Sequence, residues 1–471
     1  MKGMVTVKKR LLSMLLAVGM AASLCSCGET DKQVSSDGKI VITVGGAPNK
    51  EATPKDYENL MEDIAEFNLI RPDVEIRLDE WKYDISTFMP KAEAGLLPSV
   101  YETHFTEAKK IIELGYGCDV TKQLKERGFY ERIKDSILDT ITRDGKTYFI
   151  PKGVYTLGLM LNLELFEKAG LMEEDGTPKV PETFDELIET AKTITEKTGA
   201  AGFLFPTTEN FGGWYFTVLG WNFGAKFMNQ DADGKWKSTF DSDEAEAALQ
   251  YLKDLKWESG CMPTYTLINN AEAMKQMALG NAAMCFANPS QINSLVRTYG
   301  MDMNKIGFAK MPGNGDRRIT LMGGSFVALN PDLTEEQKEA VFDWIEFKGT
   351  TFELTDELRA KMRENMEQKI EEGKSLVGVQ DLSIWTEDSE VQKFSHELQQ
   401  EFCNVNYNHI KLYNDKSGVE YQVEEPMCTQ DLYGILDSCI QEVLNNENAD
   451  CREVLKKAAN DFQLNFLDYQ N

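Results

Sequence analysis

A strand–helix–strand pattern near the start of the chain constrains its fold most strongly. Residues 39–44 (KIVITV) form an apolar run that ends at a Gly-Gly pair, and residues 74–78 alternate apolar and polar side chains. Between them, residues 57–67 carry apolar side chains at helical spacing. Two strands joined by a crossover helix lie parallel in one sheet, so we expect an α/β protein.

The same alternation of strands and helices continues along the chain without a linker that divides it. Further strands are expected at 145–151, 157–162, 306–309 and 325–329, and helices at 84–95, 105–114, 163–170, 271–279 and in most of the chain after 334. Thr183 is placed to cap another helix, with Glu186 as its capping-box partner. This continuous pattern over 471 residues fits two lobes that the chain crosses more than once.

The charge of the chain excludes some classes of partner. There are 77 Asp and Glu residues against 50 Lys and Arg residues, which gives a net charge of −27. Nucleic-acid binding is not expected, because a duplex binder needs cations that replace the counterions of the phosphates. Docking on anionic lipids through a basic patch is not expected either. A surface this acidic keeps a protein soluble and monomeric, so we expect a monomer.

The N-terminus has the pattern of an export signal. A basic start is followed by a short apolar stretch and small residues, and residues 24–27 (LCSC) resemble the lipobox of bacterial lipoproteins. The resemblance implies a lipoprotein signal peptide over 1–26, acylation of Cys27 and an extracytoplasmic protein anchored by lipid to the cell membrane. Residues 27–38 are polar, as a tether should be. An ordinary secretion signal is the alternative.

The cysteines do not form a recognisable framework. After loss of Cys25 and acylation of Cys27, an odd and scattered set remains, without a CxxC pair. A single disulfide among Cys403, Cys428, Cys439 and Cys451 is the alternative.

Several segments, in this order, resemble the extracellular carbohydrate-binding proteins of bacterial ATP-binding-cassette (ABC) importers, the family 1 type of solute-binding protein. These segments are 145–151 (GKTYFIP), 161–171 (LNLELFEKAGL), 181–187 (PETFDEL), 280–286 (GNAAMCF), 306–313 (IGFAKMPG) and 321–330 (LMGGSFVALN). The resemblance implies a periplasmic-binding-protein-like fold, with two α/β lobes that close hinge-wise on a ligand in the interlobe cleft. It also implies a carbohydrate ligand and an ABC permease as partner.

The resemblance also implies where the chain changes lobe. Crossings are expected near 152–156, near 323–328 and around 375–385. The first lobe would then comprise 39–152 plus about 327–375, and the second 153–326 plus about 376–471.

Aromatic residues are the best candidates for ligand contact, because they can cover the apolar faces of a sugar. The densest group lies at 210–224, where glycines flank Trp214, Tyr215 and Trp221. In the resembled family this segment begins a helix at the floor of the cleft, so Trp214 is the first candidate for stacking. Trp221 lies two helical turns further on the same face. Either tryptophan could instead belong to the core.

The first lobe offers a second group of candidates. Trp81 follows the strand at 74–78 and could form the opposing wall. Glu102 and His104 would lie at the carboxyl end of another strand, where open sheets bind ligands. A structural role is the alternative for Trp81 and for His104.

The remaining candidates follow from the resemblance. Asn288 stands where many family members carry a stacking tryptophan, so its amide would replace that contact. Gly323, Gly324 and Ser325 would bring backbone N–H groups to the cleft, or the glycines would serve a hinge that needs positive φ. Trp385 is a further aromatic candidate.

Motifs of enzymes and of metal sites are missing from the sequence. P-loop, GxSxG, HExxH and GxGxxG motifs do not occur, so we expect neither an enzyme nor a cofactor. Residues 229–234 match half of a calcium loop, but Phe240 stands where the loop needs glutamate, so a hairpin turn is the better interpretation. The predicted function is therefore capture of a carbohydrate, an oligosaccharide above all. A peptide or another non-sugar ligand is the alternative, and a surface glycosidase is a further one.

Overall fold

The computed structural model of the protein describes residues 35–387 and 389–469. The predicted signal peptide, Cys27 and most of the tether lie outside these residues. Within the described part of the chain, no helix is long and apolar enough to cross a membrane.

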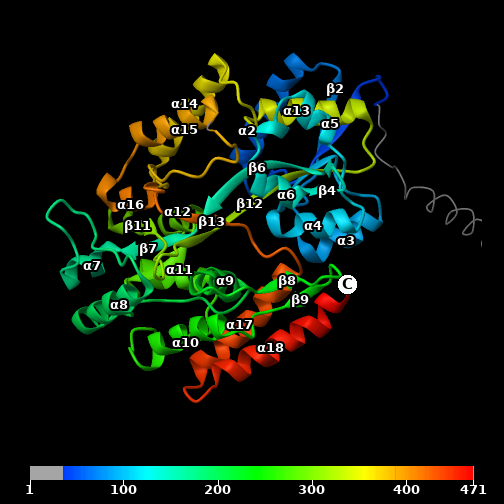
Figure 1. The fold of residues 1–471 in the computed structure, drawn as a ribbon. Helices are drawn as coiled ribbons and strands as arrows, with labels where there is room; N and C mark the ends of the chain where they lie inside the picture. The colour runs from blue at the N-terminus through cyan, green and yellow to red at the C-terminus, as the bar shows by residue number, and fades with distance from the viewer. Residues whose placement is uncertain (1–34, 388, 470–471) are drawn as a thin grey trace, which may run out of the picture.

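The first lobe is built on a mixed sheet with the order β13-β12-β3-β1-β2, in which β6 also pairs with β12 (Figure 1). Its strands are β1 (Ile40–Val44), β2 (Val74–Leu78), β3 (Val100–His104), β6 (Phe149–Thr156), β12 (Ile319–Leu329) and β13 (Glu420–Gln422). β1 and β2 pair in parallel through the crossover helix α2 (Pro54–Ile70), which confirms the predicted strand–helix–strand unit. Further helices are α3 (Ile85–Glu93), α4 (Ala108–Glu113), α5 (Thr121–Glu126), α6 (Asp135–Ile141) and α13 (Glu335–Phe347).

The second lobe is built on a smaller antiparallel sheet with the order β10-β7-β11. Its strands are β7 (Gly158–Asn162), β10 (Met284–Ala287) and β11 (Ile306–Lys310). Side chains of β7 alternate between two apolar clusters, with Leu159 and Leu161 in one and Met160 in the other. Helices therefore pack on both faces of this sheet. The helices of the second lobe are α7 (Leu163–Ala169), α8 (Phe184–Thr198), α9 (Phe211–Phe223), α10 (Asp243–Trp257), α11 (Asn270–Ala278), α12 (Pro289–Arg297), α16 (Lys411–Asn414), α17 (Thr429–Asn445) and α18 (Cys451–Asn465).

Long strands connect the two lobes. β6 continues beyond Pro151, where the sequence predicted a strand end. The pairing with β12 shifts there, because Lys152 is an extra residue between Pro151, opposite Phe326, and Gly153, opposite Ser325. Gly323 and Gly324 lie in this strand pair, and neither has a positive φ. The prediction that a hinge needs these glycines for a positive φ is therefore wrong. They are needed for close approach instead: a Cβ on Gly324 would lie 2.5 Å from the carbonyl oxygen of Gly153.

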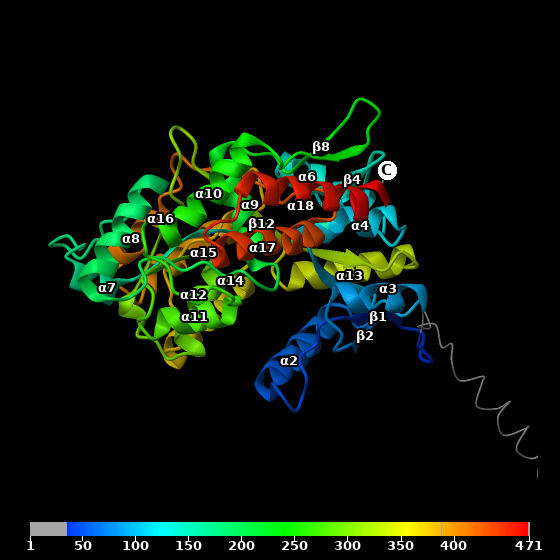
Figure 2. The same cartoon turned by 90° about the horizontal axis from the view of Figure 1, so that it is seen from below.

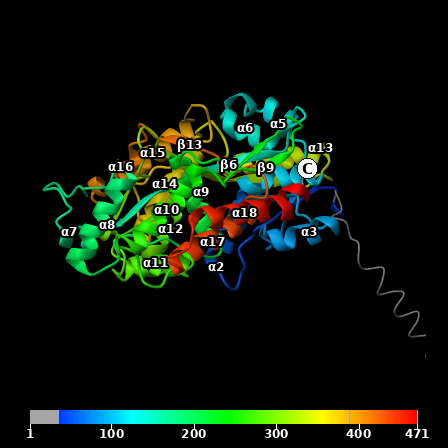
Figure 3. The same cartoon turned by 60° about the horizontal axis from the view of Figure 1, so that its bottom comes forward.

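The C-terminal part of the chain is shared between the lobes. Trp385 packs in the first-lobe core with its ring centroid 4.2 Å from that of Phe352, although the predicted boundary assigned it to the second lobe. Helices α14 (Asp356–Glu372) and α15 (Glu390–Glu401) pack together in a small cluster of their own. The chain then returns to α17 and α18, which run beneath α9 (Figure 3). The exact lobe boundaries remain a prediction.

Several local predictions can be compared with the structure. Thr183 caps α8 as expected, but the Glu186 carboxylate accepts from the N–H of Glu182 rather than of Thr183. Residues 228–238 form the hairpin of β8 (Met228–Gln230) and β9 (Trp236–Ser238), which confirms the turn. Each cysteine within 35–387 and 389–469 is a free thiol.

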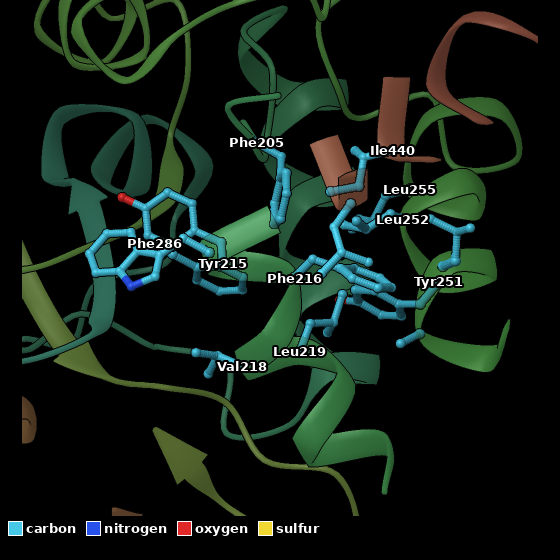
Figure 4. Close-up of a cluster of buried hydrophobic side chains, with 14 of the residues drawn as sticks. Phe205, Tyr215, Phe216, Val218, Leu219, Tyr251, Leu252, Leu255, Phe286 and Ile440 are labelled. Atoms are coloured by element: carbon cyan, nitrogen blue, oxygen red, sulfur yellow. The ribbon is translucent and has the colours of Figure 1, made fainter. Parts of the chain in front are cut away.

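Helix α9 is buried on nearly all sides, as its continuous apolar sequence favours. Figure 4 shows Phe216 and Leu219 of α9 among Tyr251, Leu252 and Leu255 of α10. Gly213 lies on the side of α9 that faces α17. Because it has no side chain, the two backbones can approach closely.

We expect Gly213→Ala to lower the free energy of unfolding by about 1–3 kcal/mol, measured by urea denaturation. A Cβ at Gly213 would lie 2.2 Å from the carbonyl oxygen of Tyr433 in α17, so the helices would have to separate. Gly153→Ala is the control, because a Cβ there meets nothing within 4 Å. Equal stability of the two variants would contradict this account of α9.

Candidate functional site

A cleft of about 440 Å³ lies between the lobes. The first lobe contributes Tyr83, Asp84, His104, Thr106 and Glu107. The second lobe contributes Glu209, Asn210, Phe211, Trp214, Asn288, Gln430 and Tyr433. Tyr155 of the connecting strand β6 and Glu424, which follows β13, complete the lining. The cleft therefore combines aromatic rings with carboxylate and amide groups from both lobes.

The start of α9 is held by a carboxylate from a distant helix. The buried Asp437 of α17 accepts from the N–H of Asn210 at 2.8 Å and from the N–H of Gly213 at 2.7 Å. Burial raises the pKa of Asp437, and these backbone hydrogen bonds oppose the rise. Glu209 and Asn210 both have positive φ, which is uncommon for residues other than glycine. This fixed turn aims the first residues of α9 at the cleft.

Trp214 forms the floor of the cleft and is 8% exposed. Its ring centroid lies 6.2 Å from that of Tyr155 and 5.9 Å from that of Phe211, both in edge-to-face geometry. Its Nε1–H donates to Glu424 at 3.1 Å, and the Tyr433 hydroxyl donates to the same oxygen. Burial raises the pKa of Glu424 to about 7. The indole is therefore held in one orientation before any ligand arrives.

The first-lobe wall consists of residues around β3 and the loop that follows β2. The Tyr83 hydroxyl donates to the buried Glu107 carboxylate at 2.7 Å, and burial raises the pKa of Tyr83. His104 is exposed, and its ring meets that of Tyr83 edge-on with centroids 6.0 Å apart. The structure thus places His104 in the cleft, where the sequence predicted it, and its role toward a ligand stays a prediction.

Asn288 lies at the opposite edge of the cleft, at the start of α12. It caps that helix in a reciprocal box with Gln291, whose amide also donates to the Tyr215 hydroxyl at 2.8 Å. Asn288 lines the cleft, whereas Tyr215 is fully buried behind it. Tyr215 therefore supports the cleft wall and does not face a ligand, contrary to its prediction as a binding residue.

Other predicted residues lie outside the cleft lining. Trp221 is buried and donates to Glu425 at 2.9 Å, and Trp385 is enclosed by first-lobe aromatics. Trp81 packs against Tyr101 and Lys91, and its Nε1–H donates to Thr87. Glu102 lies on the same face of β3 as His104, two residues earlier in the strand, but it pairs with Lys152 and does not line the cleft.

The backbone of Gly323, Gly324 and Ser325 is committed to pairing with β6, and these residues do not line the cleft. The expectation that Trp81, Glu102, Trp221, Trp385 and these three residues face the cleft is therefore not met. For the tryptophans the reason is packing, and Glu102 is held by its ion pair with Lys152.

Sequence reasoning missed several residues that line the cleft. Tyr83 and Glu107 lie close in sequence to the predicted residues Trp81 and His104. Tyr83 could have been found as an aromatic residue two positions beyond Trp81. Glu424, Gln430 and Tyr433 lie in the C-terminal region, where the sequence offers no motif. Within the described part of the chain, no group of three or more His, Cys, Asp or Glu side chains is placed to hold a metal ion.

The lobes also touch beside the cleft. The hairpin of β8 and β9 projects from the second lobe toward the first (Figure 2). The Lys109 ammonium of α4 lies 4.4 Å from the ring centroid of Trp236 in β9, and burial there lowers the pKa of Lys109. The side-chain amide of Gln430 in the second lobe donates to the hydroxyl of Thr106 in the first lobe at 3.5 Å. These contacts connect the lobes across the mouth of the cleft.

Two lobes joined by crossing strands around a polar and aromatic cleft define a protein that binds a solute between its lobes. The profile of the bacterial extracellular solute-binding protein family matches residues 64–351. This match covers more than half of the chain, and the protein belongs to this family.

Known proteins support the same fold. The diacetylchitobiose binding protein DasA of Streptomyces coelicolor is 24% identical over 252 residues, which are 52% of this chain and 56% of that protein. The chain thus matches only about half the length of this relative. The cyclic α-maltosyl-1,6-maltose binding protein of Arthrobacter globiformis superimposes with a TM-score of 0.65 at 19% identity, covering 91% of this chain and all of that one. UgpB of Mycobacterium tuberculosis, solved with glycerophosphocholine, gives a TM-score of 0.65 at 16% identity over 92% of this chain and all of that one.

Proposed function

We propose that the protein captures a carbohydrate, above all an oligosaccharide, in the interlobe cleft and delivers it unchanged to an ABC permease. The position of Trp214 carries this proposal. A tryptophan at the floor, fixed by Glu424 and flanked by further rings, offers an apolar face for a sugar ring. The surrounding carboxylates can accept hydrogen bonds from hydroxyl groups, and the side-chain amides of Asn210 and Asn288 can both donate and accept them.

The names of related proteins support a saccharide ligand. DasA is named for diacetylchitobiose, and the Arthrobacter protein for a cyclic maltosyl-maltose.

We also propose that the chain acts as a monomer and is tethered to the membrane through an acylated Cys27. Partition of the expressed protein into detergent, and loss of this partition in Cys27→Ala, would test the anchor.

A thermal-shift screen of saccharides, peptides and spermidine against residues 28–471 tests the ligand class. We expect a saccharide to stabilise the protein, by about 2.7 kcal/mol when its concentration is 100 times its Kd. Stabilisation by a peptide or by spermidine alone would contradict the proposal. Chromatography of the saccharide after long incubation should recover it intact, and hydrolysis would indicate the glycosidase alternative instead.

A further inference from the structure

The cleft is lined by acidic side chains from separate parts of the chain. Asp84, Glu107, Glu209 and Glu424 all line it, and they come from four different segments. Among the described residues that line the cleft, none is Lys or Arg. The Lys109 ammonium lies over the ring of Trp236, and Lys109 is not part of the lining.

The hydrogen bonds of these four carboxylates come from neutral donors. Glu107 accepts from the hydroxyls of Tyr83 and Thr106, although its side chain is only 4% exposed. Glu209 accepts from the Asn269 amide at 2.9 Å. Asp84 accepts from the N–H of Ser86. Within residues 35–387 and 389–469, none of the four forms an ion pair with Lys or Arg.

One buried acid outside the cleft is paired with cations. Asp63 in α2 is also mostly buried, and it pairs with both Lys348 and Lys361. A buried carboxylate without a cation costs free energy that a paired one recovers in part. The framework thus neutralises Asp63 with lysines, whereas Asp437 and Glu425 accept only from neutral donors, as the acids of the cleft do.

A ligand with a positive group would complete this arrangement. An ammonium group can donate to several carboxylates at once, and such charge-assisted hydrogen bonds are stronger than neutral ones. The faces of Tyr83 and Trp214 would also attract a cation. A hydroxyl group in the same place could form the hydrogen bonds but would not offset the charge.

We propose that the captured saccharide carries a protonated primary amine, so that its class is an amino sugar with a free amino group. This inference rests on the proposed capture of a carbohydrate. Within it, the aromatic floor holds the sugar ring and the carboxylates of the cleft select the ammonium group.

Calorimetric titration with matched saccharides tests this selection. The β-1,4-linked mono-, di- and tetrasaccharides of glucosamine, N-acetylglucosamine and glucose share one skeleton and differ at C2 in an ammonium, acetamido or hydroxyl group. Kanamycin, with maltose and maltotriose as neutral counterparts, covers α-linked rings. We expect at least one amine-bearing saccharide to bind at least about tenfold more tightly than its neutral counterparts at low salt, and this advantage to shrink at 0.5 M NaCl.

Two variants locate the selectivity. Glu209→Gln changes an exposed cleft residue, and Glu107→Gln keeps an acceptor for the Tyr83 hydroxyl. Each should reduce the advantage of the amine severalfold while affinity for neutral saccharides changes little. Glu102→Gln is the control, because Glu102 lies on β3 but outside the cleft, and it should have no effect.

The outcomes separate this inference from the proposed function. Two results would overturn the inference: neutral saccharides bind as tightly as the amines, or no amine-bearing saccharide binds. The proposed capture of a carbohydrate would still hold in either case if a neutral saccharide binds. Spermidine binding without any saccharide binding would show that the cleft selects amines and that the proposed carbohydrate function is wrong.

Discussion

Trp214→Ala is expected to weaken saccharide binding by about 2 kcal/mol, roughly 30-fold in Kd, measured by isothermal titration calorimetry. The indole lies at the floor of the cleft, and its removal takes away the apolar face on which a sugar ring would rest. The substitution also removes the donor to Glu424, so the carboxylate would lose its fixed orientation. We expect a loss of stability as well, because the side chain is largely buried.

Trp221→Ala is the matched control for this prediction. Trp221 lies two turns further along the same helix and donates to Glu425 as Trp214 donates to Glu424, but it does not line the cleft. Both variants should lose stability, by ~3–5 kcal/mol for truncation of a buried tryptophan. Only Trp214→Ala should lose affinity. Unchanged affinity in a folded Trp214→Ala protein would remove Trp214 from the binding site.

Glu425→Gln is expected to stabilise the protein at pH 8 and to have little effect near pH 4. Glu425 is buried and its pKa is raised from 4.5 to about 7 by burial, with the Trp221 indole N–H as a partner that partly opposes the rise. Between these two values the folded state keeps a proton that the unfolded state has lost. The contribution of Glu425 to the stability of the wild-type protein therefore falls as pH rises from about 4.5 to 7 and then levels off.

Glutamine keeps an acceptor for the indole N–H but cannot ionise. The wild type should thus be less stable than Glu425→Gln by up to about 3 kcal/mol above pH 7. Urea denaturation of both proteins at intervals from pH 4 to pH 8 checks this difference. Two curves that run parallel over the whole range would contradict a buried, late-titrating Glu425.

Local patterns predicted the parts of the fold that depend on local interactions. The parallel pair of β1 and β2 followed from apolar spacing, and the β8–β9 hairpin from its turn residues. The placement of Trp214 followed from glycines and aromatics within one helix together with family resemblance. Each of these features is encoded within about 40 residues of sequence.

Long-range contacts account for most of what the sequence could not predict. Asp437 fixes the start of α9 from more than 200 residues away, and Glu424 holds Trp214 from a similar distance. No motif marks either acid, since their significance comes from burial against a helix remote in sequence. For the same reason the sequence did not exclude Trp221 and Trp385 from the cleft, since their partners Glu425 and Phe129 lie more than 200 residues away. Trp81 packs locally instead, against Tyr101 of the next strand.

A crystal structure of the protein with the saccharide that stabilises it most tests the central claim directly. We predict electron density for the sugar between the two lobes, with one ring against Trp214 and polar groups near Glu107 and Glu209. Density for the sugar at any other surface, with the cleft occupied only by water, would contradict the account.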